Sequence, residues 1–110
     1  YFFKLQNYKN VFVYDNNTNK KKYSKLLGLN YINLKQAKDF NVIINTTSNY
    51  KVLEKSMSIL LNEGKIVEAS WYGSKKGYLT LGNYFHSRRI KLISIIYNLK
   101  IFIDSKKIII

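Results

Sequence analysis

The chain has 110 residues, which suits one domain with a core of ordinary size. Hydrophobic residues make up 46% and aromatic residues 15%, which argues against disorder, and no apolar run reaches the roughly 18 residues of a membrane-spanning helix. The absence of cysteine excludes disulfides and thiolate metal sites. We therefore expect a soluble protein without a membrane partner. The absence of cysteine leaves the redox compartment open, and we expect a cytoplasmic location.

The formal net charge of +13 raises the question of a polyanionic partner. Clustered basic residues bind nucleic acids by releasing counterions from the phosphate backbone. In this chain the lysines are scattered through every segment, and an abundance of Lys, Asn, Ile and Tyr without proline is typical of AT-rich codons. We attribute the charge first to compositional bias and keep a small basic nucleic-acid-binding module as an alternative.

The first predicted elements are a strand and a helix. The β-branched and aromatic run at 11–15 predicts a short strand that ends in Asp15. The segment after it predicts a helix capped by Asn17 or Thr18, and Gly28 stands where a left-handed C-terminal cap is favourable.

The middle of the chain repeats this alternation. Residues 29–34 form a weak strand pattern, and 40–49 opens with a continuous apolar run typical of a strand buried on both faces. Residues 50–63 carry apolar side chains at helical spacing, which predicts a helix with Ser48 as its N-cap and Gly64 as its terminator.

The rest of the chain predicts two more strands and a divergent tail. Residues 65–69 and 89–96 form strand patterns on either side of a glycine-containing loop. The tail at 97–110 predicts either two short strands, at 100–103 and 107–110, or a frayed end. Strands that alternate with helices form parallel sheets through crossover connections. We therefore predict an α/β fold over 1–96, with a partial Rossmann-like parallel sheet and flanking helices.

Polar residues follow three of these strands. In an open parallel sheet, the ligand site lies beyond the carboxyl ends of the strands. An acid that ends the second strand of a dinucleotide fold binds the adenosine ribose about 20 residues after a glycine fingerprint, which would here precede residue 1. The candidate cofactor-binding residues are Asp15, Asn16, Thr46, Thr47, Ser48, Ser70, Trp71, Tyr72 and Gly73.

These candidates also have structural explanations. Asp15 can cap the following helix, the hydroxyls of 46–48 can cap the next one, and Trp71 and Tyr72 can be core aromatics. If Asp15 does bind a ribose, it favours NAD over NADP because it repels a 2′-phosphate, although the lysines at 20–22 weaken that preference.

Four stretches together carry a family resemblance: VFVYD at 11–15, LLGLNYI at 26–32, the run from FNVIINTTSN to ASWYG at 40–73, and LGNYFHSRRIKLIS at 81–94. They resemble the cofactor domain of medium-chain zinc-type alcohol dehydrogenases. The branch that looks nearest is the bacterial one similar to sorbitol and bacteriochlorophyllide dehydrogenases. The resemblance covers about residues 8–95 and is most specific in its second half.

The resemblance implies NAD as the cofactor. It places Asp15 on the adenosine ribose, 46–48 beside the cofactor, and the backbone of 70–73 near the nicotinamide, with Trp71 and Tyr72 beside the ring. The parent family moves a hydride between a nicotinamide and a carbinol, and its zinc polarises the oxygen. His86 and the arginines at 88–89 belong to the family-like pattern without a specific role.

The departures from the family are large. The glycine fingerprint, the first strand and the zinc-binding catalytic domain with its Cys, His and acidic ligands do not occur in this sequence. We therefore expect a fragment of an NAD(H)-binding domain that is not itself catalytic, whose partners are the dinucleotide and the missing catalytic domain; a non-functional truncated remnant is an alternative. Because the first strand is central in this fold, its loss leaves two sheet halves with unpaired edges, unless the remaining strands close the gap by pairing directly with each other.

Overall fold

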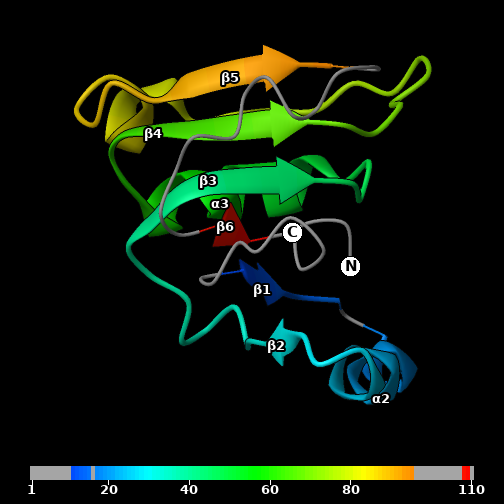
Figure 1. Ribbon diagram of the computed structural model, residues 1–110. Helices are drawn as coiled ribbons and strands as arrows, with labels where there is room; N and C mark the ends of the chain where they lie inside the picture. The colour runs from blue at the N-terminus through cyan, green and yellow to red at the C-terminus, as the bar shows by residue number, and fades with distance from the viewer. Residues whose placement is uncertain (1–10, 16, 96–107, 110) are drawn as a thin grey trace.

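The computed structural model describes residues 11–15, 17–95 and 108–109. They form one six-stranded sheet in the order β2-β1-β6-β3-β4-β5, in which all pairs are parallel (Figure 1). The elements are β1 (Val11–Val13), α2 (Thr18–Leu26), β2 (Asn30–Tyr31), β3 (Phe40–Asn45), α3 (Tyr50–Ile59), β4 (Leu60–Glu68), the π-helix η1 (Leu81–Phe85), β5 (Lys91–Ser94) and β6 (Ile108–Ile109). The prediction of an α/β fold with a partial Rossmann-like parallel sheet is confirmed.

Helix α2 begins and ends where the sequence predicts. The side chain of Asn17 accepts a hydrogen bond from the Asn19 amide at 3.0 Å, so Asn17 is the N-cap. Gly28 has a φ of 70°, the left-handed conformation that glycine adopts without a Cβ penalty. The helix buries little apolar surface, because the side chains of Tyr23 and Leu26 are both exposed.

Helix α3 is shorter than predicted, and both of its ends differ. Asn49, not Ser48, is the N-cap, and its side chain accepts from the Lys51 amide at 2.9 Å. The helix ends at Ile59, and β4 begins at once with Leu60 in an extended conformation. The prediction that the helix runs to residue 63 was therefore wrong.

Gly64 lies inside β4 and does not terminate the helix. Phe40 pairs with Leu60 but Val42 pairs with Lys65, so β4 bulges between these positions. A Cβ added to Gly64 would lie 2.9 Å from the Leu61 carbonyl oxygen, which explains why glycine fits this bulge. Helical spacing of the leucines concealed the strand, because the pairing with β3 decides the conformation here.

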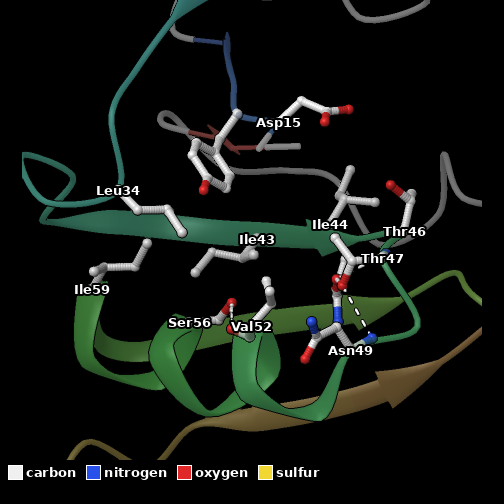
Figure 2. Close-up of a pocket in the computed structure, with 12 residues that line it drawn as sticks. Asp15, Leu34, Ile43, Ile44, Thr46, Thr47, Asn49, Val52, Ser56 and Ile59 are labelled. Atoms are coloured by element: carbon white, nitrogen blue, oxygen red, sulfur yellow. Dashed lines mark hydrogen bonds between the residues drawn. The ribbon is translucent and has the colours of Figure 1, made fainter. Parts of the chain in front are cut away.

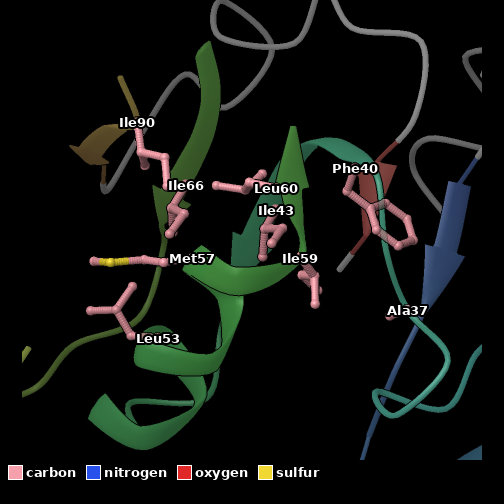
Figure 3. Close-up of a cluster of buried hydrophobic side chains, with 9 residues drawn as sticks. All are labelled: Ala37, Phe40, Ile43, Leu53, Met57, Ile59, Leu60, Ile66 and Ile90. Carbon is pink, nitrogen blue, oxygen red and sulfur yellow. The ribbon is translucent and has the colours of Figure 1, made fainter. Parts of the chain in front are cut away.

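The main core lies between α3 and the β3 and β4 strands (Figure 3). Its buried members are Ala37, Phe40, Ile43, Leu53, Met57, Ile59, Leu60, Ile66 and Ile90. The apolar run of β3 is buried on both faces, as predicted from its continuity. The ring of Phe12, from β1, meets the ring of Phe40 edge-on with centroids 5.5 Å apart, which connects β1 to this core.

The gap expected at the centre of the sheet is filled by β6. Ile108 pairs with Val11 on one side and Val42 on the other, and Ile109 pairs with Phe12 and Ile43. If β1 and β2 are taken as the second and third strands of a Rossmann sheet, and β3 as the fourth, then β6 holds the place of the first. The expectation of two half-sheets with unpaired facing edges is corrected, because a strand from the tail closes them.

The other strand pattern of the tail, at 100–103, lies outside the described residues. Within the part that is described, no helix is both long and apolar enough to cross a bilayer.

Candidate functional site

A pocket of about 300 Å³ lies beside the carboxyl ends of β1 and β3 (Figure 2). Because all strands are parallel, these two ends meet at one edge of the sheet (Figure 1). We call this space the β1–β3 pocket. Its lining residues are Tyr14, Asp15, Leu34, Ile43, Ile44, Asn45, Thr46, Thr47, Asn49, Val52, Ser56 and Ile59.

The β1–β3 pocket has an apolar part and a polar part. Leu34, Ile43 and Ile59 lie toward one end of it, whereas Asp15 and the polar residues of the 45–49 segment lie toward the other (Figure 2). Pockets that combine an apolar wall with a few convergent polar groups are the usual form of small-molecule sites. This arrangement suits a ligand with a flat apolar ring and a hydroxyl-rich polar extension.

Asp15 lines the pocket and also forms a turn with Asn17, the residue that caps α2. Its Oδ1 accepts a hydrogen bond from the Asn17 amide at 2.8 Å, and its backbone carbonyl accepts one from the Tyr31 hydroxyl. A carboxylate has about four lone-pair sites, so one such bond leaves acceptor capacity for a ligand hydroxyl. Asn16, the next predicted site residue, lies outside the described residues.

Thr46 and Thr47 also line the pocket, toward the same polar end as Asp15 (Figure 2). The amide and the hydroxyl of Thr47 donate to Asn45 Oδ1 at 3.1 and 2.7 Å, and the Thr47 hydroxyl accepts from the Asn49 amide at 3.2 Å. These local bonds fix the 45–49 segment as it turns from β3 into α3. Sequence reasoning missed Asn45 and Asn49, although an Asn on each side of a strand-to-helix turn is a typical capping signal.

The remaining predicted residues lie together but away from the pocket lining. Ser48 donates its amide hydrogen to Ser70 Oγ at 3.0 Å and its hydroxyl to the Trp71 carbonyl at 2.9 Å. The Trp71 side chain is 79% exposed, and Gly73 has a φ of 63° that favours glycine. The loop after β4 thus contacts the 45–49 segment through Ser48, which does not line the pocket.

A buried acid, which sequence reasoning also missed, connects these two segments. Glu68 Oε2 accepts from Asn45 Nδ2 at 2.9 Å and from the Tyr72 hydroxyl at 3.1 Å, and its Oε1 accepts from the Ser70 hydroxyl. Burial, and then the negative charge of Glu68, raise the pKa of Tyr72 to about 12. An acid inside the apolar run KIVEA was the available signal, because a buried carboxylate needs partners.

The basic cluster of the family-like pattern has structural contacts at the other end of the sheet. Arg88 donates to the carbonyls of Ser58 and Leu60, both at 2.9 Å, and so caps the C-terminus of α3. Arg89 forms an exposed ion pair with Glu63 at 3.3 Å. His86 is exposed, and the described residues include no group of three or more His, Cys, Asp or Glu that could hold a metal.

A scan against protein-family models finds no match to this chain, and a search of curated proteins finds none either. The fold and the pocket define a class instead: a small α/β protein with a parallel sheet and a candidate ligand pocket at its carboxyl edge. This is the edge at which open α/β sheets bind their ligands.

Proposed function

We propose that this chain binds NAD(H) and serves as the dinucleotide-binding part of an oxidoreductase similar to zinc-type alcohol dehydrogenases. The observation that supports the proposal is the convergence of Asp15, from the end of β1, with Thr46 and Thr47, from the end of β3, on one pocket. The resemblance in sequence had assigned these three residues to the cofactor.

In this proposal the adenosine half of the dinucleotide occupies the β1–β3 pocket. The adenine ring enters among Leu34, Ile43 and Val52, and the ribose hydroxyls donate to the Asp15 carboxylate. Thr46 and Thr47 lie on the opposite side of the ribose. A 2′-phosphate would meet the Asp15 carboxylate at close range, so NAD⁺ is expected to bind more tightly than NADP⁺.

The nicotinamide supplies hydride-transfer chemistry when it is bound. This chain's own residues bind and orient the adenosine end of the cofactor. Zinc does not fit the residues of this chain, which has no cysteine and, within its described part, no cluster of metal-binding side chains. We therefore assign no metal to it and propose that the family's zinc would come from a catalytic domain acting as its partner.

The test is calorimetric titration of NAD⁺ into the purified chain and its Asp15→Asn variant. Asparagine keeps the Oδ1 acceptor for the Asn17 amide, so the turn before α2 survives while the charge is lost. Hydrogen bonds to a charged group contribute about 1.5–3 kcal/mol, so affinity should fall roughly 10-fold to 100-fold.

Asp39→Asn is the matched control. Asp39 is exposed, precedes β3 at the opposite end of the sheet, and has a φ of 62° that asparagine tolerates. The control should bind NAD⁺ like the wild type. Equal weakening in both variants, or no saturable binding by the wild type, would contradict the proposal. Tight, steeply salt-dependent binding of oligonucleotides without NAD⁺ binding would instead favour the basic-module alternative.

A further inference from the structure

Among the residues that the structure describes, Glu68 is the one charged side chain that is buried. It ends β4, is only 8% exposed, and pairs in the sheet with Asn45 at the end of β3. Both of its carboxylate oxygens accept hydrogen bonds, from Asn45 and Tyr72 on one side and from Ser70 on the other. It does not line the β1–β3 pocket, so any effect on a ligand must pass through other residues.

The first connection from Glu68 to the pocket passes through Asn45. The Asn45 amide nitrogen donates to Glu68, so its oxygen faces the other way and accepts the amide and hydroxyl hydrogens of Thr47. An amide side chain carries donors on one side and an acceptor on the other, so the carboxylate determines which of them Thr47 meets.

The second connection passes through Ser70. The Ser70 hydroxyl donates its hydrogen to Glu68, which leaves its lone pairs to accept the Ser48 amide at 3.0 Å. Ser48 has a φ of 54°, in the left-handed region that few non-glycine residues adopt. The same carboxylate thus fixes two consecutive backbone amides, those of Thr47 and Ser48.

We infer that Glu68 is a positioning residue, which holds the 45–49 segment in the shape that the ligand contacts. The inference rests on the proposed function for the identity of the ligand, but the positioning itself is a property of the unliganded chain. Glu68 touches neither the pocket nor the place proposed for the cofactor. Its role is to orient Asn45 and Ser70, which in turn hold Thr47 and Ser48.

The test is Glu68→Gln, read by residue-specific amide hydrogen exchange and by NAD⁺ titration. Glutamine keeps the size of glutamate but replaces one acceptor with a donor, so it cannot accept from both Asn45 and Ser70. We expect exchange of the Thr47 and Ser48 amides to accelerate at least 10-fold, and NAD⁺ affinity to fall about 10-fold.

Ile66→Val is the matched control, because Ile66 is fully buried on the same strand and makes no side-chain hydrogen bond. It should lower global stability without accelerating exchange at Thr47 and Ser48 selectively and without changing NAD⁺ affinity. If Glu68→Gln does not fold, Ser70→Ala provides the second test. It removes only the second connection, so exchange should accelerate at Ser48 and not at Thr47.

The two readouts separate the inference from the proposed function. Accelerated exchange at Thr47 and Ser48 in a chain that never binds NAD⁺ would support the positioning role of Glu68. It would overturn the proposal that NAD(H) is the ligand. Unchanged exchange at both amides, in a folded Glu68→Gln chain, would overturn the inference whether or not NAD⁺ binds. A uniform acceleration over the whole chain, matched by Ile66→Val, would also overturn it.

Discussion

The two halves of the sheet differ in how they are stabilised. The half formed by β3, α3, β4 and β5 contains most of the buried core, and α3 alone buries Leu53, Met57 and Ile59. The half formed by β1, α2 and β2 has short strands and a helix whose Leu26 side chain is 82% exposed. The two halves are joined by β6 and by the contact between Phe12 and Phe40.

This difference matters for the pocket, because its two sides come from different halves. Asp15 follows β1 in the weakly packed half, whereas Thr46 and Thr47 follow β3 in the well-packed half. Burial of apolar surface stabilises one side of the pocket directly. The other side depends on the strand that joins the halves, so ligand binding should be more sensitive to the junction than to the core of either half.

The largest effect is expected from Phe40→Ala. Phe40 is completely buried and lies at the junction of both halves, against Phe12. Removing a buried phenyl ring typically costs about 3–5 kcal/mol, so the free energy of unfolding should fall by this amount in urea denaturation. Tyr23→Ala, which removes an exposed ring from α2, should change it by less than about 0.5 kcal/mol. Similar losses in the two variants would contradict the contrast between core and periphery.

A smaller and more local effect is expected from Ile109→Pro in β6. Proline lacks the backbone N–H and is disfavoured in an interior strand, and loss of a buried hydrogen bond costs about 1–3 kcal/mol. Amide exchange should then accelerate more in β1 and β2 than in β3 and β4, because only the former half depends on β6 for its connection to the sheet.

The control for this prediction is Ile109→Val, which keeps the N–H and a β-branched side chain. It should preserve the exchange pattern of the wild type. Equal acceleration in all strands of the proline variant would show that the sheet unfolds as one unit and that the two halves are not separable.

The smallest effect is a pH dependence from Tyr72, in the well-packed half. Its pKa is raised from about 10 in the unfolded chain to about 12 in the folded one, so the folded state holds this proton more tightly. The corresponding stability is fully present below pH 10 and is lost as the pH rises from 10 to about 12. Lysines also titrate in this range, so the measurement is the difference between the wild type and Tyr72→Phe in urea unfolding. If the free energies of unfolding of the two proteins changed in parallel above pH 10, this prediction would be contradicted.

Much of the local structure could be predicted because short-range chemistry determines it. Asn17 and Gly28 delimit α2 through a side-chain cap and a left-handed backbone, both of which depend only on neighbouring residues. The continuous apolar run of β3 identified a strand buried on both faces. Three of the predicted site residues, Asp15, Thr46 and Thr47, do line one pocket, because parallel strands bring their carboxyl ends to one edge.

The sequence by itself thus determined the alternation of strands and helices, the first helix with its caps, and the edge of the sheet where a ligand pocket forms. Only the tertiary structure decided that β4 begins at Leu60, that β6 lies between β1 and β3, and that Glu68 connects Asn45 to Ser70. The physical reason is the range of the interactions. Caps and periodicity act within a few residues, whereas strand order and buried hydrogen bonds join residues that are distant in the chain.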